Sequence, residues 1–166
     1  MIALGSNIGD RLLNLQKAVD LLRVEIQLAR PSSVYETAPM YLEDQPEFLN
    51  AAIEGFTELG PVPLLRILKR IEADIGRQSR RVNGPREVDL DLILYAGLKY
   101  RYEEGGRVVL QIPHPKLSER RFVLAPMADV GENVNIPGIG RVLDLLAKTN
   151  EQAESVVRIT DAVLHI

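Results

Sequence analysis

The sequence predicts a mixed α/β (α+β) fold, in which helices pack on a mostly antiparallel sheet in the βαββαβ order of the ferredoxin-like sandwich. Two segments carry apolar residues at helical spacing, and four short apolar runs have the pattern of strands. They follow one another as strand, helix, strand, strand, helix, strand. The 166 residues and their 46% hydrophobic content suit a single domain over residues 1–166.

The first strand and the first helix are expected at the start of the chain. Ile2–Leu4 is a short apolar run, and the polar residues 5–10 then turn the chain and supply N-cap residues. Apolar residues recur at helical spacing from there, which predicts a helix over residues 10–28, stopped by Pro31. The members of this stripe are Leu12, Leu15, Val19, Leu22 and Ile26.

Two further strands and a second helix are expected next. Residues 32–35 and 49–57 predict strands, separated by a loop over 37–47 that contains two prolines. The second helix begins after the punctuation at residues 60–63 and ends at Gly76. Three side chains on the third strand share one face by its period of two: Phe48, Asn50 and Ala52.

The second half of the chain starts with a polar, basic loop over residues 78–86 and the clearest strand, Val88–Tyr95. Residues 96–112 predict a hairpin around two glycines, and short helices are expected over 118–130 and 142–148. The tail after Asn150 has an alternating apolar pattern at its end, which suits either an extra strand or a packing arm.

Two carboxylates are the strongest chemical signal. On the strand that contains them, Asp89 and Asp91 point to one side while Leu90 and its apolar neighbours point to the other. Two like charges on a central strand are costly unless a cation or basic groups compensate them. With no Cys or His beside them, a hard cation such as Mg²⁺ is expected, and salt bridges to arginines are the alternative.

Arginines precede this strand: Arg77, Arg80, Arg81 and Arg86. Guanidinium groups suit polyphosphates, so these arginines beside a carboxylate pair favour phosphoryl transfer. Neither a GxxxxGK[ST] nor a GxGxxG motif occurs, so a nucleotide must be held by another device. Basic residues outnumber acidic ones between Arg66 and Arg121 although the net charge is -3, which indicates a local anion site or a solvated basic face.

Two other features have both a functional and a purely structural interpretation. His114 lies between two prolines, where a lone histidine is more often structural than catalytic. Phe48 beside Asn50 offers an aromatic ring and an amide, which an aromatic heterocycle would use, although core packing explains Phe48 equally well.

Composition narrows the classes of function. The chain has no cysteine and two histidines, which excludes disulfides and thiolate metal sites and fits the cytoplasm. No apolar stretch reaches the roughly 18–20 residues that span a membrane, and the first residues lack the features of a signal peptide. The low aromatic content of 5% and the net negative charge argue against an RNA-binding module of the same topology.

Several motifs together resemble a known family, 6-hydroxymethyl-7,8-dihydropterin pyrophosphokinase of folate biosynthesis. The resemblance covers nearly the whole chain. Its motifs are Gly5-Ser6-Asn7, Asp44-Gln45-Pro46, Asn50-Ala51-Ala52, Gly84-Pro85-Arg86-Glu87-Val88-Asp89-Leu90-Asp91 and Pro113-His114. It implies a ferredoxin-like fold and transfer of diphosphate from ATP to the pterin alcohol, with AMP as the other product.

The resemblance also implies roles for individual residues. Asp89 and Asp91 would coordinate two Mg²⁺ ions and act in catalysis with Arg77 and Arg86. The residues expected around ATP are Glu72, Arg77, Arg86, Leu92, His114 and Arg120. The residues expected around the pterin are Thr37, Ala38, Met40, Phe48, Asn50 and Phe122. The implied partners are these small molecules and other folate-pathway enzymes, with no nucleic acid and no membrane.

The chain departs from the family pattern at several positions. Phe48 stands where Tyr is common, Asn83 where some members have Trp, and the loop before Gly84 is one residue shorter. These departures leave the roles of Arg80 and Arg81 open. Two other classes remain alternatives: a kinase or nucleotidyl transferase that uses the same aspartates, and a non-catalytic ferredoxin-like binding module.

Overall fold

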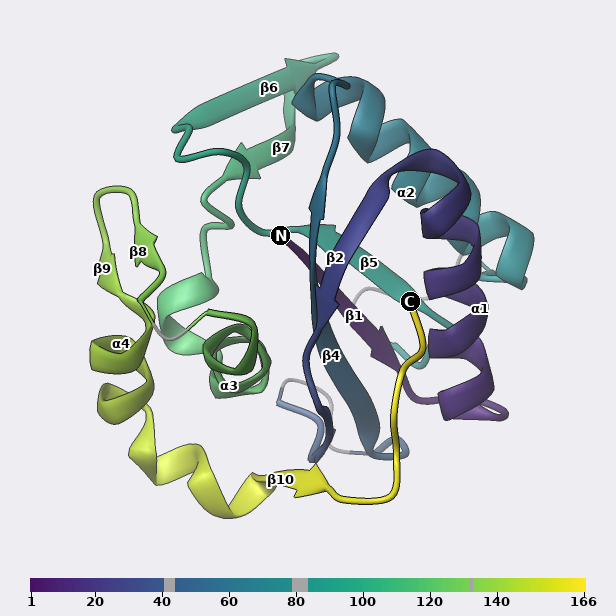
Figure 1. Ribbon diagram of the computed structural model, residues 1–166, viewed down its shortest axis with the longest axis vertical. Coiled ribbons are helices and arrows are strands. Elements are labelled where there is room, and N and C mark those ends of the chain that lie inside the picture. The colour runs from purple at the N-terminus through teal and green to yellow at the C-terminus, as the bar shows by residue number, and fades with distance from the viewer. Residues whose placement is uncertain (41–43, 79–83, 132) are drawn as a thin grey trace.

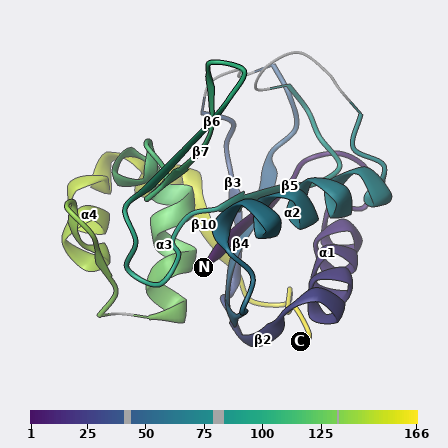
Figure 2. The ribbon, with the colours of Figure 1, turned by 90° about the horizontal axis from the view of Figure 1, so that it is seen from above.

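The computed structural model describes residues 1–40, 44–78, 84–131 and 133–166, and its elements form three layers (Figure 1). A sheet lies in the middle, and helices α1 (Arg11–Glu25) and α2 (Pro61–Ile75) cover one face. Helix α3 (Arg121–Val130) packs on the opposite face and carries α4 (Val142–Lys148) on its outer side (Figure 2).

The sheet is antiparallel throughout its described pairs. Its order is β10-β3-β4-β1-β5, and β2 also pairs with β4. The bounds are β1 Ile2–Ser6, β2 Gln27–Pro31, β3 Val34–Thr37, β4 Phe48–Phe56, β5 Asp89–Leu92 and β10 Val156–Ile159. The strand β1 lies between β4 and β5, as the ferredoxin-like order requires, so the predicted fold class is confirmed.

The first helix is shorter than predicted. Asp10 caps it, since its carboxylate accepts from the amide of Leu13, but it ends at Glu25, where Ile26 turns to an extended conformation. The prediction of a helix to residue 28 was wrong, because residues 27–31 form β2 along β4. The apolar spacing predicts too long a helix because Ile26 continues that spacing and is buried, although it lies outside the helix.

Other boundaries also differ from the predicted ones. The strands predicted over residues 32–35 and 49–57 correspond to β3 and β4. The strand predicted over Val88–Tyr95 is shorter and has only the four residues of β5. The helix predicted from Ser118 begins instead at Arg121, after the 3-10 turn η1 (Leu117–Glu119). Helix α2 follows the prediction, with proline in its first turn and left-handed Gly76 (φ 106°) at its end.

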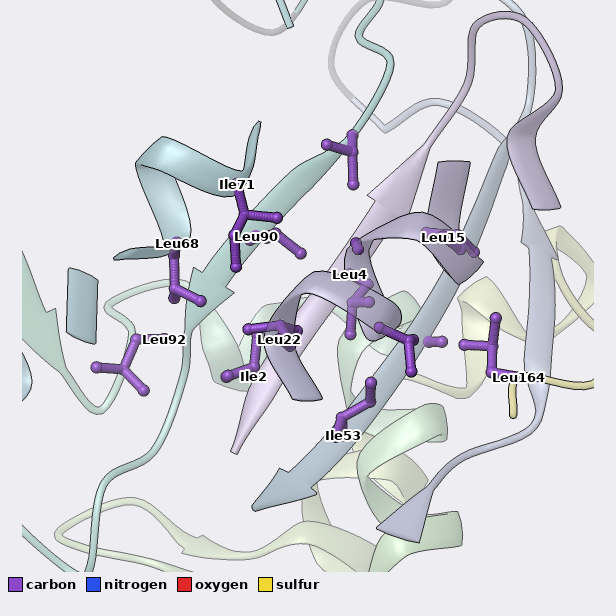
Figure 3. Close-up of a cluster of buried hydrophobic side chains, with 14 of the residues drawn as sticks. Ile2, Leu4, Leu15, Leu22, Ile53, Leu68, Ile71, Leu90, Leu92 and Leu164 are labelled. Atoms are coloured by element: carbon purple, nitrogen blue, oxygen red, sulfur yellow. The ribbon is translucent and has the colours of Figure 1, made fainter. Parts of the chain in front are cut away.

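The hydrophobic core has two parts, one on each face of the sheet. In the first, shown in Figure 3, Leu4 and Leu90 from the strands pack against Leu22 and Leu68 from the helices. The second lies under α3 and is centred on Ala52, Leu124 and Met127. Because Leu90 faces the first part, its neighbours Asp89 and Asp91 face the side of the sheet that α3 covers.

The hairpin predicted over residues 96–112 is confirmed as β6 (Tyr100–Glu104) and β7 (Arg107–Ile112). A smaller one, β8 (Asn135–Ile136) and β9 (Gly140–Arg141), precedes α4. The tail forms both an extra strand and a packing arm. After the 3-10 helix η2 (Asn150–Ser155), β10 joins the sheet, and Leu164 packs in the first core. No helix in the described ranges is long and apolar enough to cross a membrane.

Candidate active site

A cavity of about 640 Å³ lies where β1, β3, β4 and β5 meet the end of α2 and the start of α3. All but one of the predicted site residues line it: Thr37, Ala38, Met40, Phe48, Asn50, Glu72, Arg77, Arg86, Asp89, Asp91, His114, Arg120 and Phe122. The exception is Leu92, whose side chain is 3% exposed and packs in the first core. Leu92 has the parity of Leu90 on β5 and so points away from the cavity. Arg80 and Arg81 lie outside the described residues.

The floor of the cavity is formed by small residues of β1. Gly5 lies opposite Asn50 on one neighbouring strand and Asp89 on the other, and Ala3 lies between Ala52 and Asp91. A Cβ atom on Gly5 would come 3.1 Å from Oδ1 of Asn50. Gly5 therefore leaves a trough between the carboxylates and the amide. Gly5 belongs to a predicted motif, but its role could not be predicted because this contact depends on the sheet register.

A chain of ion pairs runs along one wall. Nη1 atoms of Arg77 and Arg86 each donate to Asp89, to different carboxylate oxygens and both at 2.6 Å. Arg77 also pairs with Glu72, and the distance is 2.5 Å. Glu72 in turn accepts from Lys69 at 2.8 Å and from the amide of Leu90 at 2.7 Å. The salt-bridge alternative for the aspartates thus holds for Asp89, while Asp91 has no ion pair among the described residues.

This arrangement fixes the charge of the central groups. Burial alone would raise the pKa of Asp89, but Arg77, Arg86 and Lys69 bring it below its ordinary value. Burial lowers the pKa of His114, against the opposing charge of Asp91. At neutral pH the site therefore presents an ionised Asp89 beside a neutral imidazole at His114.

Asn7 was missed as a site residue, and it joins two loops at the cavity rim. It is 1% exposed, and its side-chain amide donates to Oε1 of Gln45 and to the carbonyl of Pro46, both at 3.1 Å. Its Oδ1 accepts from the amide of Arg86 at 2.8 Å. The position of Arg86 is thus tied to the end of β1.

Aromatic rings and an amide gather at the other end of the cavity. Nδ2 of Asn50 donates to Oγ1 of Thr37 at 2.7 Å, which orients its Oδ1. Guanidinium groups lie over both rings, Arg86 over Phe48 at 5.8 Å and Arg120 over Phe122 at 5.6 Å from the ring centroids. This end suits a flat heterocycle, with faces for stacking and polar groups for its edge.

The carboxylates of the cavity supply only part of a metal-ion shell. Among the described residues no group of three or more His, Asp or Glu side chains is arranged to hold one. Asp89 and Asp91 supply carboxylates on one face of β5, and the oxygens of Asp89 keep further lone pairs beside their bonds to the arginines. Mg²⁺ is commonly bound by one or two carboxylates together with phosphate oxygens and water, so this pair fits it as a partial shell.

Comparison with known proteins places these residues in context. Residues 1–132 match the family described as 7,8-dihydro-6-hydroxymethylpterin-pyrophosphokinase. The chain is 44% identical over 135 residues to the 2-amino-4-hydroxy-6-hydroxymethyldihydropteridine pyrophosphokinase of Bacillus subtilis, covering 80% of this chain and 78% of that one. It is 48% identical over 131 residues to the mitochondrial folate synthesis bifunctional protein of Pisum sativum, covering 78% of this chain.

The chain spans 24% of the length of that plant protein. Among solved structures, a triple mutant of Plasmodium falciparum HPPK-DHPS with pteroate has a TM-score of 0.72 at 15% identity, over 95% of this chain and 46% of that one. At this identity the likeness shows the fold, and it agrees with the order of helices and strands described above.

Proposed function

Because the chain belongs to the 7,8-dihydro-6-hydroxymethylpterin-pyrophosphokinase family, we propose that it transfers diphosphate from ATP to 6-hydroxymethyl-7,8-dihydropterin in folate biosynthesis. The products would be the pterin diphosphate and AMP. The observation that carries this proposal is the single cavity in which Asp89, Asp91, Arg77 and Arg86 face the rings of Phe48 and Phe122.

The pterin would occupy the aromatic end. Phe48 and Phe122 would stack on its two faces, while Asn50 and the backbone near Thr37 and Met40 would hydrogen-bond its edge. Asn50 is 7% exposed, so a ligand that left polar groups unpaired beside its amide would bind weakly. This favours a ligand whose donors and acceptors match those of Asn50.

ATP would lie along the charged wall. Arg77 and Arg86 would contact the phosphates as charge-assisted donors, and Glu72, His114 and Arg120 would line the rest of the nucleotide site. Two Mg²⁺ ions held by Asp89 and Asp91 would neutralise phosphate charge and align the reacting groups. Bound phosphate would compete with Asp89 for the same guanidinium groups. Arg77 and Arg86 would then divide their hydrogen bonds between the phosphate and Asp89.

The chemistry needs alignment more than a covalent intermediate. The hydroxymethyl oxygen of the pterin would attack the β-phosphorus of ATP, the bond to the oxygen bridging the α- and β-phosphorus atoms would break, and the hydroxyl proton would leave. The cations on the wall would stabilise charge on the transferred group, and closure around the substrates would exclude water.

The same proposal includes the domain organisation, the cellular location and the partners of the chain. Residues 1–166 would act as one domain, in the cytoplasm, on small molecules. The relative from Pisum sativum is a folate synthesis bifunctional protein by name, which supports other folate-pathway enzymes as functional neighbours. Neither nucleic acid nor a membrane would take part in the reaction.

A product assay tests the proposal. Purified protein with ATP, MgCl₂ and 6-hydroxymethyl-7,8-dihydropterin should release AMP and pterin diphosphate in equal amounts. Asp91→Asn should lower turnover by roughly a hundredfold or more. The matched control Asp144→Asn, at an exposed position on α4, should leave it unchanged. ADP as the nucleotide product would point to an ordinary kinase, and full activity of Asp91→Asn would remove the metal site from the mechanism.

A further inference from the structure

The segment that follows α4 contacts two parts of the cavity's aromatic end, the start of α3 and the end of β3. Figure 1 shows it running from α4 to β10 at the sheet edge and then toward α1. It lies beyond residues 1–132, the part that matches the family. Its contacts therefore concern a part of this chain about which the family match says nothing.

One end of this segment is fixed to the start of α3 through Gln152. Oε1 of Gln152 accepts from the amide of Arg121, and Nε2 donates to the carbonyl of Glu119, both at 3.1 Å. These two backbone groups flank Arg120, and the next residue along is Phe122. One carboxamide thus holds the backbone on both sides of a cavity-lining arginine.

Arg121 adds a second connection in the opposite direction. Its Nη1 donates to the carbonyl of Leu146 at 2.8 Å and to that of Thr149 at 3.4 Å. The start of α3 is therefore tied by hydrogen bonds both to the end of α4 and to η2. This makes the backbone of residues 119–122 dependent on the segment that contains Gln152.

The other end of the segment is fixed to the pterin-side strand. The carbonyl of Ser155 accepts from the amide of Ala38 at 3.1 Å, and Val156 lies opposite Thr37 in the β10–β3 pair. Thr37 in turn receives the hydrogen bond from Asn50. Only two residues separate Gln152 from Ser155, so one short stretch holds both walls of the aromatic end.

We propose that Gln152 is a positioning residue for the pterin site, acting through the backbone of residues 119–122 and coupling it to the strand that carries Thr37. This inference rests on the proposed function, because it concerns the affinity for that substrate. Gln152 touches no part of the cavity itself, since it is absent from its lining. ATP would be affected less, because Arg120 is the one residue of its expected site in this stretch, while Arg77 and Arg86 come from the end of α2 and the segment before β5.

The test compares Gln152→Met, which keeps the size of the side chain and loses both polar contacts, with Gln152→Glu, which keeps the acceptor for the amide of Arg121. Gln27→Met is the matched control, at an exposed position on β2. Loss of two hydrogen bonds to backbone predicts a rise of roughly tenfold in the KM for the pterin in Gln152→Met. The KM for ATP should change by less than about threefold, and Gln152→Glu should fall between wild type and Gln152→Met.

Hydrogen exchange supplies a readout that needs no turnover. Peptides covering residues 119–124 should exchange faster in Gln152→Met than in wild type, and Gln27→Met should match wild type. If wild type is active but Gln152→Met keeps its pterin KM or its exchange rate, the positioning role is wrong while the proposed function stands. If Gln152→Met only melts at lower temperature with both KM values unchanged, the residue is structural and the inference fails. If wild type itself makes no AMP, both proposals fall together.

Discussion

Asn7 and Arg86, 79 residues apart in the chain, hold each other by two hydrogen bonds. The amide of Arg86 donates to Oδ1 of Asn7 at 2.8 Å, and the amide of Asn7 donates to the carbonyl of Arg86 at 3.1 Å. Since Asn7 also binds Gln45 and Pro46, a single buried side chain at the end of β1 sets the positions of two cavity loops.

Asn7→Ala should weaken both folding and catalysis. Leaving buried backbone partners unpaired costs about 1–3 kcal/mol, so the free energy of unfolding should fall by that amount in urea titrations. Misplacement of Arg86 by about 1 Å is enough for a loss of roughly a hundredfold in kcat/KM. Asn135→Ala, at an exposed position on β8, serves as the control. Wild-type kinetics in Asn7→Ala would show that Arg86 is positioned without it.

The two aspartates should respond differently to replacement by asparagine. Asp89 is paired with Arg77 and Arg86, so Asp89→Asn should lower the Tm of the free protein by removing one ion pair from each guanidinium group, which leaves Arg77 with Glu72 alone among the described residues. Asp91→Asn should leave that Tm nearly unchanged. Both should lose the stabilisation that MgCl₂ with ATP gives to wild type. An Asp91→Asn variant that MgCl₂ and ATP still stabilise as they do wild type would contradict the metal assignment.

Gly5→Ala should affect the pterin more than ATP. The added Cβ would lie 3.1 Å from Oδ1 of Asn50, so the amide has to move away from the pterin edge. Loss of that hydrogen-bonding geometry predicts a rise of roughly tenfold in the pterin KM. Gly60→Ala is the control, because its nearest neighbour would be an atom of Pro63 at 3.8 Å, an ordinary contact. Equal KM values for the two variants would mean that the trough at Gly5 has no part in binding.

Tyr35, on the strand that carries Thr37, should make the fold sensitive to alkali. Burial, reinforced by the charge of Asp129, raises the pKa of Tyr35 to about 12. The folded state then keeps its phenol proton where the unfolded chain has lost it, so stability should fall as pH rises from about 10 to about 12. Unfolding in urea across this range should show a smaller loss in Tyr35→Phe. Parallel curves for the two proteins would rule Tyr35 out as the source.

The strand that carries the two aspartates could be predicted because its signal is local. Alternation on β5 separates Leu90 from Asp89 and Asp91, and this follows from the period of two alone. The same alternation predicts Leu92 to lie in the core, where the structure places it. Only the family resemblance assigns Leu92 to the ATP site. The placement of the Phe48 ring beside the Asn50 amide could also be predicted from one strand.

What could not be predicted depends on pairing between distant segments. The role of Gly5 requires the register of β1 against β4, and that of Asn7 requires loops from three parts of the chain. The apolar spacing predicts helix at the start of β2 because Ile26 continues it, and only the pairing of β2 with β4 decides its conformation. The contacts of Gln152 likewise appear only once the tail is folded back on α3.

The most direct test of the central claim is a single-turnover reaction with enzyme in excess over ATP labelled at the α-phosphorus, in the presence of Mg²⁺ and 6-hydroxymethyl-7,8-dihydropterin. Transfer of diphosphate in one step predicts that the label passes from ATP to AMP in step with pterin diphosphate, with no ADP at any time. Labelled ADP as the product, or as an intermediate that precedes AMP, would contradict attack at the β-phosphorus.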